Sequence, residues 1–181
     1  MTIATKNSII SPFWDNFYYV YFILHFFTTV LADSSAVLPK NLVYFSSFLD
    51  KYSYEVDDFL MIERPQWFRV LVWIELCFQA PLFLWFFNMI NRYYDEWKKF
   101  ASSEEAKLNI KKNAFQLASL IKFMMRIYGV LATTTTLYCI YVIYTTGHYP
   151  NTDIPLPMSN KLKLICIYSP FALIPSKLLL V

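Results

Sequence analysis

Long runs of apolar residues alternate with polar segments along the 181-residue chain. Four of the runs contain about 20 residues or more, which is the length that a helix needs to cross the hydrocarbon core of a bilayer. Polar segments of very different charge separate these runs. The pattern predicts one all-α domain over residues 1–181, a four-transmembrane-helix bundle with spans at about 17–38, 68–90, 123–146 and 161–181.

The segments outside the spans differ in their expected order. Residues 1–15 are expected to form a loose tail, and residues 39–67, rich in aromatic and acidic side chains, a partly ordered cover over the helix ends. Residues 91–122 have the pattern of a solvated helix that continues the neighbouring spans. Pro81 removes a backbone donor inside the second span, so a kink is expected there.

Lysine and arginine are unevenly distributed between the loops. Residues 91–122 contain seven of them, against three in residues 39–67 and two in residues 147–163. The positive-inside rule therefore assigns residues 91–122 to the cytosol. With four spans, both termini are then cytosolic, and the other two loops lie on the far side. Lys122 and Arg126 are expected to extend to the cytosolic interface.

Composition sets the class of protein. With 57% hydrophobic and 20% aromatic residues, the sequence is that of a membrane protein. Two glycines argue against glycine-rich phosphate loops, and the three cysteines lie in apolar runs without ligand spacing. The net charge of +3 is spread through the loops and forms no dense basic face. We therefore expect no cofactor, no metal site and no nucleic-acid partner.

Two acids lie inside the predicted spans. Asp33 comes shortly before the far-side end of the first span, and Glu75 shortly after the far-side start of the second. At 1.5 Å per residue both lie roughly 7–11 Å below the same surface, so they can be neighbours. Since a charge near the bilayer centre costs about 2.5 kcal/mol or more, such an acid normally faces protein or a water-lined cavity. We expect Glu75 to line an internal ligand cavity; the alternative is a protonated structural side chain that bonds a neighbouring helix.

Other polar side chains occur at the same level. Gln79 lies one helical turn from Glu75, and Tyr168 lies a short way into the last span from the same side. The threonine run at 133–136 ends within about a turn of this level; its hydroxyls are expected to bond their own helix or a partner helix. Polar groups from several helices therefore converge in one half of the bundle.

The walls of this cavity are expected to be apolar and aromatic. The faces that hold Asp33 and Glu75 continue along their helices through Thr29, Phe26 and Phe22 on the first span and through Gln79, Leu82 and Phe86 on the second. His25 lies about two turns before Asp33 and either borders the cavity or is structural. Asp58 either folds back over the acidic end or is an ordinary solvated acid.

The expected site suits two kinds of ligand. Two carboxyls close together at low dielectric cannot both ionise cheaply, so the pair should share a proton unless a cation enters. A lipophilic amine would place its ammonium against a carboxylate and its rings against the aromatic wall. A sterol or similar lipid would instead hydrogen-bond the acids through its hydroxyl.

Four stretches carry a family resemblance. In chain order they read DSSAVLP at 33–39, ERPQWF at 63–68, ELCFQAP at 75–81 and YSPFALIP at 168–175. Their order and spacing across the spans resemble the sigma-2 receptor branch of the EXPERA-domain family, four-helix proteins of the endoplasmic reticulum related to sterol Δ8-Δ7 isomerases. The resemblance implies an acid at Asp33 that meets ligand ammonium groups, a supporting acid at Asp58 and a buried acid at Glu75.

Within this family the chain most resembles the fungal members called efficient mitochondria targeting-associated proteins. That likeness implies a non-enzymatic role at the endoplasmic reticulum surface, where mislocalised mitochondrial precursors are cleared or rerouted together with quality-control factors. A homodimer is one assembly that such a protein could form.

Two other functions compete with this reading. Relatives that isomerise sterols appear by resemblance to use a His and a Glu one turn apart on the first helix, whereas the residue one turn after His25 is Thr29. A channel or transporter would need a polar path through both leaflets, and the cytosolic halves of the spans are almost wholly apolar.

Overall fold

The computed structural model describes residues 8–102 and 107–181, and the side chains of residues 100–108 also lie outside the description. Every regular element in the described residues is helical, and their one strand-like feature is an isolated bridge between His148 and Pro155. The all-α prediction is confirmed.

The N-terminal segment is more ordered than expected. Helix α1 (Pro12–Leu31) begins where the Ser11 hydroxyl accepts a bond from the Trp14 N–H at 3.3 Å. Asp15, which the sequence assigned to a loose tail, accepts bonds from the backbone N–H groups of Ile9 and Ile10 at 2.7 and 2.8 Å. The tail prediction was therefore wrong for this part, and residues 1–7 lie outside the described chain.

The first helix ends earlier than the apolar pattern predicts. It stops at Leu31 and not near Leu38, and the chain continues in a 3-10 turn, η1 (Asp33–Ala36). The Ser34 hydroxyl donates to the Val30 carbonyl at 2.6 Å. Short polar side chains compete with the helix for backbone groups in this way, so the Asp-Ser-Ser sequence ends the helix.

The remaining long helices follow one another along the chain. One continuous helix consists of α4 (Gln66–Ile74), a π-helical segment η3 (Glu75–Gln79) and α5 (Ala80–Ser102). It is followed by α6 (Lys107–Thr146), α7 (Met158–Ser176) and a terminal 3-10 turn η4 (Lys177–Leu180). Helices α5 and α6 extend into the 91–122 segment as expected, although residues 103–106 of that segment are outside the described chain.

Three of the described helices are long and apolar enough to cross a membrane, at Gln66–Lys99, Asn109–Thr146 and Met158–Leu180. They correspond to the second, third and fourth predicted spans. Helix α1 is not among them, because Asp15, its tyrosines and His25 lower its mean hydropathy. The protein is thus a membrane protein with three helices of spanning length and a fourth, α1, of more polar composition.

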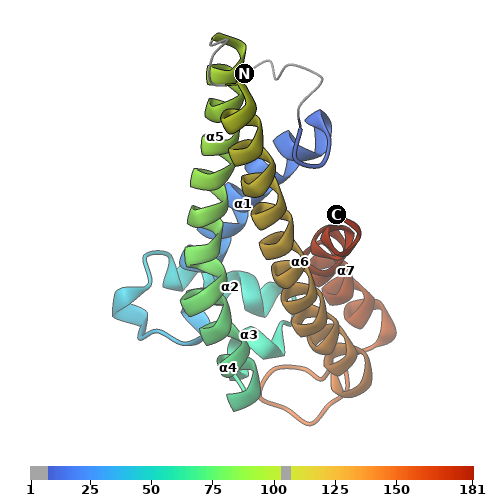
Figure 1. Ribbon diagram of the computed structural model, residues 1–181. Coiled ribbons are helices and arrows are strands. Elements are labelled where there is room, and N and C mark those ends of the chain that lie inside the picture. The colour runs from blue at the N-terminus through green and yellow to red at the C-terminus, as the bar shows by residue number, and fades with distance from the viewer. Residues whose placement is uncertain (1–7, 103–106) are drawn as a thin grey trace.

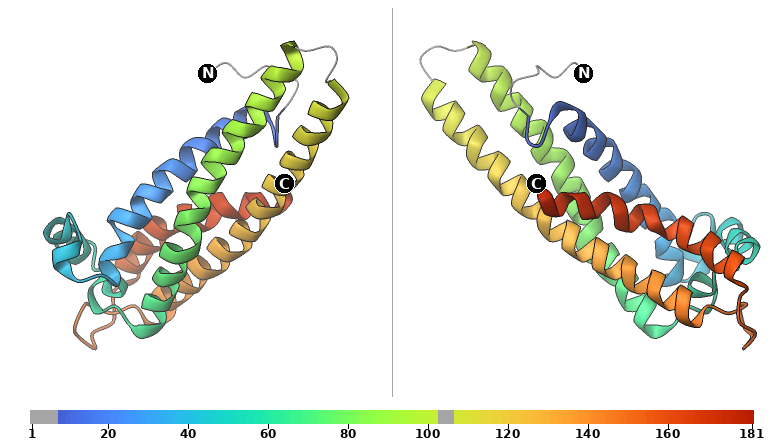
Figure 2. Two further views of the ribbon diagram at one scale, coloured as in Figure 1. Left: turned by 60° about the vertical axis from the view of Figure 1, so that its left-hand side comes forward. Right: turned by 90° about the vertical axis from the view of Figure 1, so that its right-hand side faces the viewer.

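The long helices pack in a simple order. Helix α7 packs along α6 (Figure 1), and α5 packs against both α6 and α1, with α1 on its far side in the left view of Figure 2. Figure 2 shows that the short elements of residues 32–65 gather at one end of the bundle, while the first described residues lie at the opposite end beside α5 and α6. Different segments of the chain therefore cover the two ends of the bundle.

Aromatic side chains fill the middle of the bundle. Phe22 of α1 stacks on Phe86 of α5 with ring centroids 4.4 Å apart, and Phe83 and Tyr128 surround this pair. All four side chains are less than 2% exposed. Since lipid is as apolar as these rings, close packing rather than exclusion of water stabilises the contact.

Gly129 brings α6 and α7 close together. A Cβ placed on this residue would lie 2.9 Å from the Pro175 carbonyl oxygen, so only glycine permits the observed approach. The nearby threonines reinforce it, because the hydroxyls of Thr133 and Thr136 donate to α7 carbonyls at 3.4 Å. Thr134 and Thr135 instead bond carbonyls of their own helix at 2.7 and 3.0 Å. Both expected uses of the threonine run occur.

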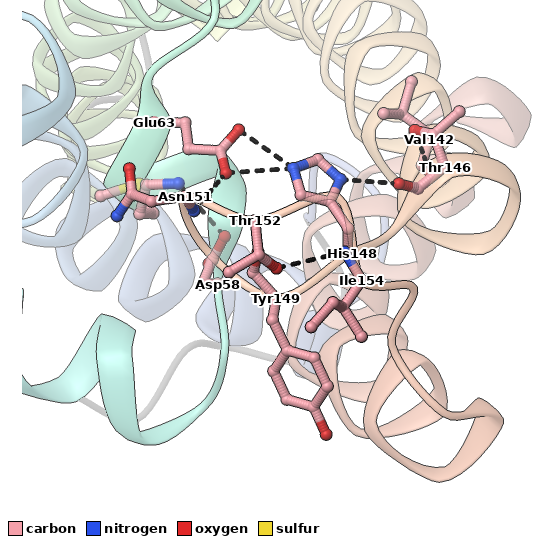
Figure 3. A network of polar contacts seen from close by, with 10 residues as sticks. Asp58, Glu63, Val142, Thr146, His148, Tyr149, Asn151, Thr152 and Ile154 are labelled. Atoms are coloured by element: carbon pink, nitrogen blue, oxygen red, sulfur yellow. Dashed lines mark hydrogen bonds and ion pairs between the residues drawn. The ribbon is translucent and has the colours of Figure 1, made fainter.

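The segment between α1 and α4 is partly helical, as expected. It contains α2 (Ser46–Glu55) and α3 (Phe59–Glu63). The Glu63 carboxylate joins this segment to the loop after α6: His148 Nε2 lies 3.0 Å away, and the Asn151 N–H donates at 2.8 Å (Figure 3). The two loops at this end of the bundle are thereby held together.

Candidate functional site

A pocket of about 270 Å³ lies at the end of the bundle that α2 and α3 cover. Residues from α1, α4, η3, α6 and α7 also contribute to its wall. Six of the seven residues that the sequence indicated line it: His25, Asp33, Asp58, Glu75, Gln79 and Tyr168. Its volume is near the lower limit of ligand pockets, which is about 300 Å³, so it fits a small molecule or one end of a longer lipid.

Three acids meet at this pocket, where the depth argument placed two. Asp33 begins the 3-10 turn after α1, Glu75 begins the π-helical segment, and Asp58 caps α3. Asp33 interacts electrostatically with both of the others. Asp33 and Glu75 are half-buried, and Asp58 is 6% exposed. The acids are therefore close neighbours, and none of them points away to lipid.

Asp58 is tied to two other elements. Its carboxylate accepts the backbone N–H of Met61 at 3.2 Å and the Tyr168 hydroxyl at 3.0 Å. Burial raises the pKa of Asp58 from its ordinary 3.8 to about 6, and these hydrogen bonds oppose part of that rise. Asp58 is thus a buried acid that lines the pocket, as in the reading that folds it back over the acidic end, and not a solvated loop acid.

The helix that carries Glu75 changes its winding at this point. Residues Glu75–Gln79 form a π-helical turn, in which the Ala80 N–H donates to the Glu75 carbonyl five residues earlier. Pro81 has no N–H with which to bond the Cys77 carbonyl, so an ordinary α-helical ladder cannot continue here. The distortion predicted from Pro81 takes this form. Such π turns are frequent at functional sites.

The deep wall of the pocket is polar as well. The His25 ring contributes to it, and His25 Nδ1 lies 3.0 Å from the Tyr128 hydroxyl, which lies 3.0 Å from the hydroxyl of Tyr21. Gln79 is 1% exposed, and among the described residues its amide nitrogen has no hydrogen-bond partner. A buried amide N–H without a partner is costly, and a ligand acceptor in the pocket would satisfy it.

Thr29 and the expected aromatic face lie elsewhere. Thr29 does not line the pocket, and its side chain is 0% exposed. Its hydroxyl meets no hydrogen-bond geometry among the described residues but lies close enough to the Asp33 carboxyl to interact with it, so Thr29 stands behind the acid and outside the pocket wall. Helix α1 contributes His25 and Thr28 to the pocket wall, and Ala32, the residue that follows the helix, also lines it. Likewise Phe22, Phe26, Leu82 and Phe86 are outside the pocket lining, contrary to the expectation, because the bundle core takes this face.

Several pocket residues escaped the sequence argument. Leu49, Tyr52 and Ser53 of α2 line the pocket, as do Phe68 at the start of α4 and Phe171 of α7. Phe171 could have been found from the same face argument, since it lies one turn from Tyr168. The α2 residues could not, because no periodic pattern reveals that a loop folds back over helix ends. These side chains supply the apolar wall that the expected aromatic face does not.

The three acids do not make a metal site. Within residues 8–102 and 107–181 no group of three His, Cys, Asp or Glu side chains has an arrangement that could hold a metal ion. The arrangement can instead accept hydrogen bonds, share protons and attract an organic cation, with an apolar wall opposite.

Comparison with known proteins identifies a family and several relatives. The model of the EXPERA (EXPanded EBP superfamily) family matches residues 44–181, a range that includes Asp58, Glu75, Gln79 and Tyr168 but not Asp33. Efficient mitochondria targeting-associated protein 19 of Saccharomyces cerevisiae is 36% identical over 166 residues, which cover 90% of this chain and 92% of the relative.

Receptor proteins are related as well. Sigma intracellular receptor 2 of Xenopus tropicalis is 28% identical over 169 residues, which cover 90% of this chain and 84% of the relative. The Homo sapiens protein of the same name is 41% identical over a shorter stretch of 66 residues, covering 35% of this chain and 38% of the relative. With a family match over most of its length and a full-length relative at 36% identity, the chain belongs to the EXPERA family.

Proposed function

We propose that this protein binds a lipophilic amine or a sterol-like lipid in the pocket, as a non-enzymatic membrane protein of the endoplasmic reticulum. The observation that carries the proposal is the meeting of Asp33, Asp58 and Glu75 at one apolar-walled pocket. Three neighbouring acids in low dielectric repel one another when ionised, and an ammonium group relieves that repulsion. Gln79 offers a neutral donor deeper in the same pocket.

The pocket volume bears on the ligand class. At about 270 Å³ it accepts a small aromatic amine without rearrangement, whereas a sterol would enter only with one end or after movement of the wall. Tyr52, Phe68 and Phe171 provide aromatic surface for either ligand. In this proposal Asp33 is the ion-pair partner, and the neighbouring Glu75 and Asp58 disfavour its ionised form until an ammonium group enters.

Saturable binding of a radiolabelled lipophilic amine to the purified full chain tests the proposal. Asp33→Asn, which keeps the shape of the side chain, should abolish saturable binding and leave the unfolding midpoint within a few degrees of wild type. Asp153→Asn, at an exposed loop acid, serves as the matched control and should bind normally. Unchanged affinity in Asp33→Asn would exclude the site.

The proposed cellular role is clearance or rerouting of mitochondrial precursor proteins at the endoplasmic reticulum surface, in contact with quality-control factors there. Its support is the full-length similarity to a protein named for efficient mitochondria targeting. A cell that lacks the protein should show altered turnover of mitochondrial precursors at the endoplasmic reticulum. Expression of Asp33→Asn in that cell would tell whether the pocket is needed for the role, and normal turnover without the protein would refute it.

In the same proposal α1 is a fourth span and both termini are cytosolic, so the pocket lies toward the lumen. The seven cations in residues 91–122 support this orientation. A glycosylation acceptor placed in residues 147–157 should be modified in the endoplasmic reticulum, and one placed in the 91–122 segment should not. The opposite pattern of glycosylation would show that the protein has the reverse orientation in the membrane.

We propose a binding protein rather than an enzyme because the first helix does not offer an acid next to His25. Thr29, one turn later, is neither acidic nor part of the pocket wall. Complementation of a strain that lacks its sterol isomerase checks this point, and restored sterol composition would favour catalysis.

A further inference from the structure

A second hollow lies at the other end of the bundle. It is a groove of about 760 Å³ between α5, α6 and the first described residues of the chain, within the size range of ligand sites, which is about 300–1,000 Å³. Lys111, Lys112 and Lys122 of α6 line it, together with Tyr93 and Trp97 of α5. Figure 2 shows the N-terminal segment beside these two helices.

The N-terminal wall of the groove is held in place by a buried acid. Ser8 and Ile9 form part of this wall. Asp15, which is 2% exposed, accepts the backbone N–H of Ile9 at 2.7 Å and also accepts the hydroxyl of Tyr94 on α5. The segment is thereby fixed against α5, so the groove exists before any ligand arrives.

The charge in the groove is not neutralised. Among the described residues no acid lines it, and none of its three lysines forms an ion pair there. Elsewhere on the same hairpin lysines do pair, as Lys98 does with Asp95 at 2.8 Å. Three ammonium groups along one groove, without a counter-charge among the described residues, attract an anion.

The position of the groove relative to the membrane suggests which anion this is. Lys111 and Lys122 lie on one face of α6, roughly 16 Å apart along the helix axis. The helix Asn109–Thr146 contains an apolar window of spanning length, and with the span expected from about residue 123, Lys122 lies at its start. Phe115 and Phe123 are exposed by 76% and 58%. The groove therefore has a charged and an apolar side at the start of a spanning helix, where aromatic residues favour the bilayer interface.

We infer that this groove binds the headgroup of an anionic phospholipid, with the phosphate against Lys122, the acyl chains along the exposed Phe123 of α6, and Lys111 and Lys112 adding attraction at the outer end of the groove. Basic pockets between spanning helices bind anionic headgroups in this manner. The site is independent of the pocket that holds Asp33, because the two lie at opposite ends of the bundle.

Enrichment of an anionic lipid around the protein tests this inference directly. The full chain is reconstituted in nanodiscs of phosphatidylcholine with phosphatidylserine, and energy transfer from tryptophan to dansyl-phosphatidylserine gives the lipid enrichment around the protein. Replacing Lys111, Lys112 and Lys122 by Gln should weaken phosphatidylserine enrichment about fivefold for each lysine. The matched control replaces Lys51, Lys161 and Lys163 by Gln, which removes the same charge at the opposite end.

The inference would be overturned if both triple variants lost phosphatidylserine enrichment equally. Full enrichment in the Lys111, Lys112 and Lys122 variant would overturn it too. Soluble glycerol phosphate that competes as well as the lipid would also overturn it, because the bilayer would then play no part. Binding of the lipophilic amine in the other pocket should be unchanged in the groove variant, so failure of one proposal is distinguishable from failure of the other.

Discussion

The Tyr168 hydroxyl donates a hydrogen bond to the Asp58 carboxylate at 3.0 Å, across 110 positions of sequence. This bond connects α7 to the start of α3, and both residues line the pocket. It therefore places an acid from a loop against a spanning helix. Sequence spacing alone could not predict that these two side chains meet.

Removing this hydroxyl should weaken the fold. Tyr168→Phe leaves the Asp58 carboxylate with the Met61 N–H as its other bond, and loss of a hydrogen bond to a carboxylate costs roughly 1.5–3 kcal/mol. A lower unfolding midpoint in detergent would record it. Tyr141→Phe, at a position 62% exposed, is the control and should be nearly silent. Equal midpoints for both variants would show that the bond contributes nothing.

The pH dependence of stability should contain a term from Asp58. Since burial raises its pKa from 3.8 to about 6, the folded state holds this proton more tightly than the unfolded state. The contribution is complete below about pH 4 and is lost as the pH rises through about 6, by roughly 2–3 kcal/mol in total. Subtracting the unfolding profile of Asp58→Asn from that of wild type isolates this term. A difference that stays constant from pH 4 to pH 7 would contradict it.

The contact at Gly129 should not tolerate a methyl group. In Gly129→Ala the new Cβ meets the Pro175 carbonyl 2.9 Å away, so α6 and α7 must separate, at a cost of roughly 1–3 kcal/mol. Thermal unfolding measures the cost. Val130→Ala, one residue along on an exposed position, should change stability by less than about 0.5 kcal/mol.

The buried Asp15 should hold the N-terminal segment. Asp15→Ala leaves the N–H groups of Ile9 and Ile10 and the Tyr94 hydroxyl without their acceptor, each at a cost of roughly 1–3 kcal/mol if it remains buried. Hydrogen exchange at residues 9 and 10 should become fast, while exchange in α7 stays slow. Slow exchange in the variant would mean that packing alone holds the segment.

The contact between Glu63 and His148 should govern the order of the loop after α6. The two His148 nitrogens lie 3.0 Å from the Glu63 carboxylate and 2.9 Å from the Thr146 carbonyl, so the ring connects the loop to both α3 and the end of α6. Glu63→Gln removes the carboxylate charge and leaves one side-chain oxygen where His148 Nε2 and the Asn151 N–H share two. We expect faster hydrogen exchange in residues 147–157, with Glu55→Gln as the exposed control.

Much of the candidate site was predictable, for a specific reason. Asp33 and Glu75 stand out because acids are rare in apolar runs, and depth along two antiparallel helices brings them to one level. Thr29 and the Phe22 face were misplaced because the apolar pattern gives no sign that α1 stops at Leu31. Once the helix ends there, Asp33 still interacts with Thr29 one turn earlier, but the face that continues through Phe22 no longer reaches the pocket.

The sequence by itself determined that this chain is an all-helical membrane protein with acids at a shared depth, because hydropathy and periodicity are local properties. Only the tertiary structure decided that Asp58 joins those acids, that α2 closes the pocket and that Asp15 holds the N-terminal wall of a second groove. These features depend on where irregular segments fold back onto helix ends. Such contacts are made between residues far apart in the chain, and no local pattern records them.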